Sequence, residues 1–195
     1  MNQPSLKAVA ISLDSLKSFT SSALEEYEAC TPEDPPGCFA VLVGSVEGDV
    51  AIVADLEFAT NARAVEQVAL EEFSTTVAPC FGAAYKNPRR GFWCSSRDLL
   101  RIHRRADELD LEILGSIHLH PDWHRIGPLA ERGLCISEIP TPMDEYMFRN
   151  TGYAVNMICY MESTGGTVST AIAAWTPPSD TNSPCNHLPV RFLVS

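Results

Sequence analysis

The stretch Gly-Ser-Ile-His-Leu-His-Pro at residues 115–121 decides how the chain is interpreted. Apolar residues around its two histidines are typical of a buried strand, which we expect to span residues 111–120 and to end at Pro121. Side chains two positions apart point to the same face of a strand, so His118 and His120 would lie side by side. Two imidazoles at the end of one strand can bind one metal ion, although a His-x-His pair is more often an ordinary surface or core feature.

A third ligand for such an ion follows in Pro-Thr-Pro-Met-Asp at residues 140–144, where a short helix over 144–150 is expected to begin. Asp144 would add one carboxylate oxygen to two imidazole nitrogens. Three protein ligands and an open fourth position are typical of catalytic rather than structural zinc sites. Zinc in such a site lowers the pKa of its bound water to about 7 and polarises a carbonyl oxygen.

The rest of the chain predicts a single mixed α/β domain in which helices alternate with strands, many of them joined as hairpins. Periodicity and turn residues predict strands over 8–11, 38–44, 50–58, 154–161, 168–175 and 190–194, and helices over 13–27, 62–74 and 98–108. They predict a loop or irregular strand over 79–90 and loops over 121–142 and 177–189.

Composition limits the function classes. The 195 residues are 45% apolar, which is typical of a globular protein, and carry 14 basic and 25 acidic side chains, a formal net charge of −11. An acidic chain disfavours nonspecific binding to nucleic acid or to an anionic membrane. We expect no membrane span and no secretion signal. Seven cysteines without a Cys-x-x-Cys pair indicate free thiols in a reducing, cytoplasmic compartment.

The motif residues give the chain a resemblance to a known family. It resembles the JAMM (MPN or Jab) zinc metallopeptidases, whose signature is His-x-His-Pro followed by Ser-x-x-Asp, with a glutamate on an earlier strand. The resemblance implies that His118, His120 and Asp144 are the zinc ligands. It also implies that Thr141 takes the place of the family's serine, because it keeps the hydroxyl.

The resemblance covers about residues 6–176 of what we expect to be one domain spanning residues 1–195, with a JAMM-like sheet flanked by helices. The family has fewer residues between its second histidine and its aspartate than the 23 found here. We therefore expect an inserted loop at about 122–139, which would serve as a lid or a substrate selector. Alternatively, His124 or Cys135 of this loop would supply a fourth ligand and close the site.

The family's general-base glutamate has no counterpart in register. With Gly44 aligned on the second glycine of the family's Gly-x-x-x-Gly strand, Gly37 stands where the glutamate is expected. The nearest carboxylates are Glu33 and Asp34, and Glu33 is our candidate base. A strand rises about 3.3 Å per residue, so only a compact turn through the prolines at 35–36 would return Glu33 to the site. Asp34, a base from elsewhere and no base at all are the alternatives.

The resemblance implies a zinc-dependent hydrolase that uses metal-activated water to cleave an amide or isopeptide bond. The substrate would be the C-terminal tail of a ubiquitin-like or sulfur-carrier protein. The base would pass the water's proton to the leaving amine, and the Thr141 hydroxyl would help to stabilise the oxyanion. Two other hypotheses stay open: a catalytically impaired MPN-like module that binds a ubiquitin-fold or scaffold partner, and a small-molecule amide hydrolase closed by the inserted loop.

Two further features have both a functional and an ordinary interpretation. Seven of the 14 basic residues lie within residues 86–105, where they would dock an acidic partner or form a solvated helix face. Trp123 directly follows the histidine strand and would line a substrate groove or pack at the rim of the core.

Overall fold

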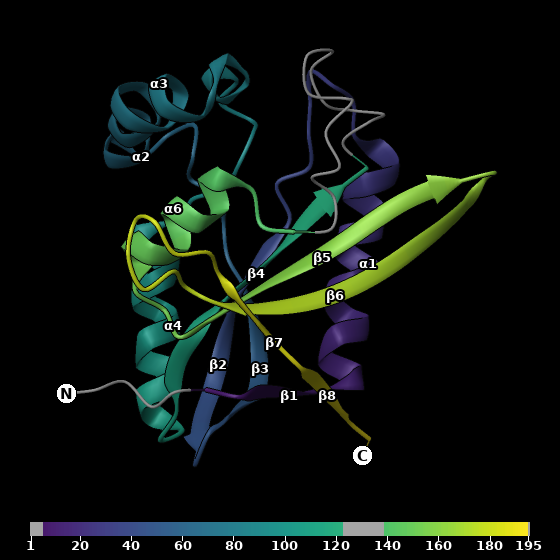
Figure 1. The fold of residues 1–195 in the computed structure, drawn as a ribbon, viewed down its shortest axis with the longest axis vertical. Helices are drawn as coiled ribbons and strands as arrows, with labels where there is room; N and C mark the ends of the chain where they lie inside the picture. The colour runs from purple at the N-terminus through teal and green to yellow at the C-terminus, as the bar shows by residue number, and fades with distance from the viewer. Residues whose placement is uncertain (1–5, 123–138, 195) are drawn as a thin grey trace.

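A computed structural model of the chain describes residues 6–122 and 139–194. The elements, in chain order, are β1 (Ala8–Ser12), α1 (Leu13–Ala29), β2 (Phe39–Glu47), β3 (Val50–Phe58), α2 (Gln67–Glu72), the π-helix η1 (Phe73–Val77), α3 (Ala78–Phe81), the 3₁₀-helix η2 (Ala83–Lys86), α4 (Ser96–Glu108), β4 (Glu112–Pro121), α6 (Pro142–Thr151), β5 (Val155–Thr164), β6 (Thr167–Thr176), β7 (Asn186–Leu188) and β8 (Val190–Leu193). The described strands form one eight-stranded sheet in the order β7-β6-β5-β4-β2-β3-β1-β8, and helices flank it (Figure 1). This arrangement confirms the predicted single mixed α/β domain.

The sheet is nearly closed, because its two outermost strands are neighbours in sequence. β7 pairs with β6 at one end of the strand order, and β8 pairs with β1 at the other. Only Pro189 separates β7 from β8, and its carbonyl oxygen accepts a hydrogen bond of 2.9 Å from the backbone N–H of Val9. The chain itself therefore joins the two edges of the sheet.

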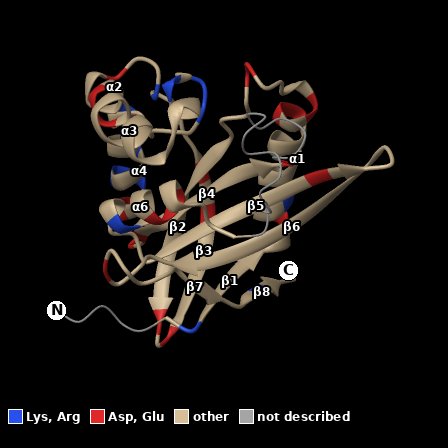
Figure 2. Cartoon of the chain, turned by 45° about the horizontal axis from the view of Figure 1, so that its top comes forward, with Lys and Arg blue, Asp and Glu red and all other residues tan. Residues whose placement is uncertain are grey.

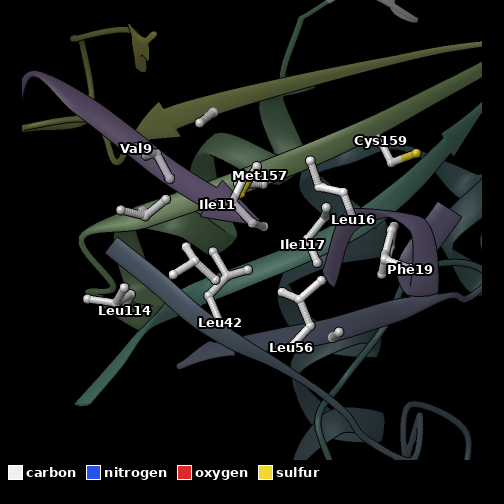
Figure 3. Close-up of a cluster of buried hydrophobic side chains, with 14 of the residues drawn as sticks. Val9, Ile11, Leu16, Phe19, Leu42, Leu56, Leu114, Ile117, Met157 and Cys159 are labelled. Atoms are coloured by element: carbon white, nitrogen blue, oxygen red, sulfur yellow. The ribbon is translucent and has the colours of Figure 1, made fainter. Parts of the chain in front are cut away.

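One face of the sheet packs on α1. The Ser12 side chain caps this helix by accepting a hydrogen bond of 3.0 Å from the Ser15 N–H. Buried residues follow at helical spacing and meet strand residues in the main core, which Figure 3 shows. Leu16 and Phe19 contribute from α1, and Leu42, Ile117 and Met157 contribute from β2, β4 and β5.

The opposite face of the sheet packs on α4 and α6. Ile102 of α4 is fully buried in a cluster with Val41 and Val43 of β2. Phe148 of α6 packs in another cluster with Ile158 of β5. Because successive strand residues alternate between faces, each central strand contributes to both layers. The candidate site lies on this second face.

The structure corrects the predicted helix over 62–74 and the predicted loop over 79–90. The helix begins only at Gln67, and helical turns continue through η1, α3 and η2 into the stretch taken as a loop. The prolines and glycines there favoured a loop or irregular strand, yet Pro79 lies at the start of α3, directly after the π-helix η1, where the regular α-helical hydrogen-bond pattern is already interrupted. β7 also lies inside the predicted loop over 177–189, because three residues show no detectable alternation.

Three other sequence predictions concern membrane-spanning segments, the cysteines and the inserted loop. No helix in the described part of the chain is long and apolar enough to cross a membrane. The cysteines within the described ranges are all free, as predicted. Residues 123–138 lie outside the described residues, and with them Trp123, His124, Cys135 and nearly all of the predicted inserted loop.

Candidate metal centre

β4 presents both histidines to the face that α6 covers. It lies between β2 and β5, with His118 opposite Phe39 on one side and Ile158 on the other. Ile117 points into the main core against α1, so the histidines on either side of Leu119 point the other way. The His118 side chain is 6% exposed and that of His120 is 15% exposed. The predicted arrangement on one strand face is confirmed.

Asp144 reaches the histidines from the first turn of α6. Thr141 caps this helix, and the two residues form a reciprocal capping box. Asp144 Oδ2 accepts hydrogen bonds from the backbone N–H of Thr141 at 2.7 Å and from its hydroxyl at 2.6 Å. The sequence motif Thr-Pro-Met-Asp therefore starts the helix and fixes the orientation of a carboxylate that is 3% exposed.

The three side chains converge on one point. The two Nε2 atoms of His118 and His120 lie 3.0 Å apart, and Asp144 Oδ1 and Oδ2 lie 3.3 and 3.2 Å from them, respectively. Ligand atoms at about 2.0–2.2 Å from a tetrahedral zinc ion are themselves about 3.3 Å apart. The His118–His120–Asp144 group can therefore hold a metal ion.

The protonation states of the group also suit a metal ion. Burial lowers the pKa of His118, and this effect exceeds the opposing influence of the Asp144 carboxylate. Burial alone would raise the pKa of Asp144, but His120 and His118 hold it well below its ordinary value. At neutral pH the group thus offers a neutral imidazole and an ionised carboxylate, which are the forms that bind metals.

Among the described residues, one buried atom of the group has no protein partner for a hydrogen bond. His118 Nδ1 has no hydrogen-bond partner among the described residues, although it is fully enclosed. Its ring is held instead by aromatic contacts, with a centroid distance of 4.9 Å to Phe92 and 6.1 Å to Phe148. The imidazole is therefore positioned by packing, with Nε2 directed at Asp144.

A cavity of about 70 Å³ opens beside the three side chains. Its walls are mostly apolar and come from the loop before β2, the segment before α4, and the start of α6. The lining includes Pro36, Phe92 and Met143, together with Tyr85 and Arg90. A ligand in this cavity would contact all three donor side chains.

The two candidate bases lie outside this cavity lining. Glu33 is exposed, and its backbone carbonyl accepts a hydrogen bond of 2.9 Å from the Asn87 side chain. Asp34 forms an exposed ion pair of 2.5 Å with Arg89. Among the described lining residues, Asp144 is the one carboxylate. The structure thus brings together His118, His120, Asp144 and Thr141 but leaves Glu33 and Asp34 at the surface.

The position where the family's glutamate is expected is occupied by another side chain. A Cβ atom on Gly37 would lie 2.7 Å from Asn61 Nδ2. Asn61 is itself fixed, because its amide group donates to the Gly91 carbonyl at 3.0 Å and accepts from the Trp93 N–H at 3.1 Å. A longer side chain at position 37 would have to displace this asparagine.

The sequence did not identify Tyr85, Arg90 and Phe92 as site residues. They belong to the segment that links α3 to α4 and that was interpreted as a loop or irregular strand. Arginines and aromatic residues recur over residues 85–93, and this was the one available signal. Periodicity gave no signal, because tertiary contacts carry this segment to the end of β4.

The predicted basic cluster is partly neutralised. Arg101 and Arg105 of α4 pair with Glu57 at 2.8 and 2.6 Å, and Arg89 pairs with Asp34. Figure 2 shows acidic and basic segments interspersed around α2, α3 and α4. Arg90 is turned inward and is 8% exposed. These pairs favour the interpretation as a solvated helix face over that as a docking surface.

No protein-family model and no curated protein matches the chain.

Proposed function

We propose that the chain is a zinc-dependent hydrolase of the JAMM type that cleaves an amide or isopeptide bond. Its substrate is the C-terminal tail of a ubiquitin-like or sulfur-carrier protein. One observation carries the proposal: two imidazole nitrogens and a carboxylate lie 3.0–3.3 Å apart beside a cavity. A structural zinc site would surround the ion with four protein ligands, whereas three are present among the described residues.

The residues of the chain divide the work of such a site. His118, His120 and Asp144 would hold the zinc ion, and Thr141 keeps the Asp144 carboxylate in place through two hydrogen bonds. Zinc bound there would supply Lewis acidity, which acidifies water and polarises a carbonyl oxygen. The apolar walls limit access of bulk water and thereby strengthen electrostatic interactions within the cavity.

The shape of the cavity supports an extended substrate segment with small side chains. A volume of about 70 Å³ holds about five water molecules at the usual 10–15 Å³ each. Pro36 and Phe92 contribute to its walls, and neither side chain can fold away easily. A narrow tail fits this space better than a bulky side chain.

The function is tested with protein that is stripped by a chelator and reloaded with one equivalent of zinc. The substrates are ubiquitin-fold proteins with a fluorogenic amide at the C-terminus. We expect turnover only in the reloaded protein, at least about 100-fold above the stripped protein. Zinc binding without turnover on any of these substrates would contradict the hydrolase. Failure to bind zinc would remove the metal site as well.

The same assay tests whether Glu33, the candidate named from the sequence, is the general base. Its side chain does not line the cavity, so we expect Glu33→Gln to keep turnover within about threefold of the wild type, far from the 10²–10⁴-fold contribution of a general base. Asp34→Asn tests the alternative base in the same assay, because it removes the neighbouring carboxylate. A 100-fold loss in Glu33→Gln alone would instead identify Glu33 as the base.

A catalytically impaired module is the second candidate. It is favoured by the absence of a second carboxylate among the described lining residues. Such a module would bind a ubiquitin-fold or scaffold partner through the same cavity. A stable complex with an uncleaved ubiquitin-fold protein, together with no turnover after zinc loading, would support it.

A further inference from the structure

The main chain around Tyr85 is fixed in place. Its N–H donates to the Gly82 carbonyl at 3.1 Å, and its own carbonyl accepts a hydrogen bond of 3.0 Å from Arg63. Arg63 is 4% exposed, and its guanidinium stacks 3.6 Å above the centroid of the Phe73 ring. A buried arginine therefore anchors the turn that carries Tyr85.

The side chain of Tyr85 lies in the wall of the metal-site cavity. It is 6% exposed and lines the cavity together with His118, His120 and Asp144. The guanidinium of Arg90 lies 4.3 Å from the centroid of its ring. Burial raises the pKa of the phenol, whereas Arg90 and Thr141 lie close enough to the hydroxyl to oppose that effect. The phenol is thus held between a cation and the start of α6.

The hydroxyl of Thr141 is already committed. It donates to Asp144 Oδ2 at 2.6 Å and accepts from the Asp144 N–H at 3.2 Å. A hydroxyl group has a single proton to donate. If Thr141 donated that proton to a substrate, it would give up one of the two hydrogen bonds that orient the Asp144 carboxylate. Thr141 is therefore placed to hold Asp144, and another donor is needed for an oxyanion.

We propose that the hydroxyl of Tyr85 is this donor, and that it forms a hydrogen bond to the substrate carbonyl oxygen as negative charge develops there. The inference rests on the proposed hydrolase function. Tyrosine is protonated at neutral pH, since its ordinary pKa is about 10. Guanidinium groups have donors only, so beside Arg90 the phenol oxygen acts as an acceptor. Thr141, whose proton is committed to Asp144, offers the phenol proton only a neutral oxygen at rest, which a negatively charged substrate oxygen would replace as the acceptor. The proton stays on Tyr85 throughout, and no bond of the residue is made or broken.

The test compares Tyr85→Phe with Tyr27→Phe, which removes a hydroxyl from a buried tyrosine of α1 in the main core. We expect Tyr85→Phe to lower kcat by about 10²–10³-fold, the usual effect of losing one oxyanion donor, with little change in KM. Zinc content and unfolding midpoint should match those of the wild type. Tyr27→Phe should leave kcat unchanged.

A binding measurement adds a readout that does not depend on turnover. Acetohydroxamate is titrated into the cobalt(II)-loaded protein while the visible absorption is followed. We expect Tyr85→Phe to weaken binding about 10- to 150-fold, as loss of one hydrogen bond to a charged group predicts. Replacing Tyr85 with 4-aminophenylalanine, which keeps an N–H donor, should recover part of both losses even where Tyr85→Phe folds poorly.

The outcomes separate this inference from the proposed function. A protein that binds no cobalt or cleaves nothing contradicts the function itself. Normal turnover in the Tyr85→Phe variant would overturn only the role of Tyr85. Loss of metal in Tyr85→Phe, without recovery by 4-aminophenylalanine, would show a structural role and would also overturn the inference.

Discussion

Replacing His120 with alanine is expected to reduce the zinc content of the purified protein from about one ion per chain to nearly none. Three side chains supply the donors, and two remaining donors bind zinc much more weakly. Removing a residue that only forms a hydrogen bond to a metal ligand typically lowers metal affinity about 10- to 100-fold, and removing the ligand itself lowers it further. The measurement is metal analysis after dialysis against a weak chelator.

His103→Ala is the matched control for this variant. His103 is exposed on α4, away from the cavity lining, so its removal should leave the zinc content unchanged. Turnover should disappear in His120→Ala and persist in His103→Ala. Full zinc content in His120→Ala would refute the centre as described, as would equal losses in both variants.

The candidate metal ligands could be predicted from the sequence because the local structure around each of them follows local rules. The strand period of two places His118 and His120 on one face, and burial of Ile117 and Leu119 on the other face confirms it. Asp144 follows a threonine and a proline that are typical of a helix start. These local rules do not predict that Asp144 meets the two histidines. The family resemblance implied that meeting, and in the structure α6 brings Asp144 to the end of β4.

The wall of the cavity could not be predicted from the sequence, because it depends on contacts between residues that are distant along the chain. Tyr85 is held by Arg63, which is 22 positions earlier in the chain, and no spacing rule predicts that hydrogen bond. The environment of Gly37 likewise depends on Asn61. Counting residues back from Gly44 located the position of the expected glutamate, but counting cannot show which side chain fills the space.

The pairing of strands also went beyond what local pattern can specify. The β2–β3 hairpin has a local signal in the sequence, because it turns at a glycine, Gly48, which adopts a positive φ of 63°. The parallel pairs of β4 with β5 and of β1 with β8 join segments far apart in sequence. Alternation of apolar residues shows which face is buried but gives no information about the neighbouring strand.

Replacing Gly115 with alanine is expected to give the largest loss of stability of the variants considered. A Cβ atom there would lie 1.5 Å from the Val155 carbonyl oxygen and 2.7 Å from its carbonyl carbon. These are backbone atoms of the adjacent parallel strand, so no side-chain rotation can make room. The substitution must push β4 and β5 apart where Gly115 pairs with Val155.

We expect a loss of about 3 kcal/mol or more, at the upper end of the range for overpacked positions. In a chain of this length, each kcal/mol lowers the midpoint of thermal unfolding by about 2–4 °C, which predicts a decrease of about 6–12 °C. Gly165→Ala is the control, because a Cβ there meets nothing within 4 Å. Its positive φ of 60° should cost about 1–2 kcal/mol. Equal midpoints for the two variants would contradict the close approach of β4 and β5.

The same substitution should also weaken the metal centre, because His118 lies three residues further along β4. Separation of β4 from β5 shifts the strand that positions both imidazoles, whereas Gly165 lies in the turn between β5 and β6. The three donors of the proposed zinc site meet only in the folded state, so excess zinc should raise the unfolding midpoint of Gly115→Ala, by less than it raises that of Gly165→Ala. Thermal scans of both variants with and without zinc measure this difference. An equal zinc effect in both would show that the histidines keep their positions when the two strands are forced apart.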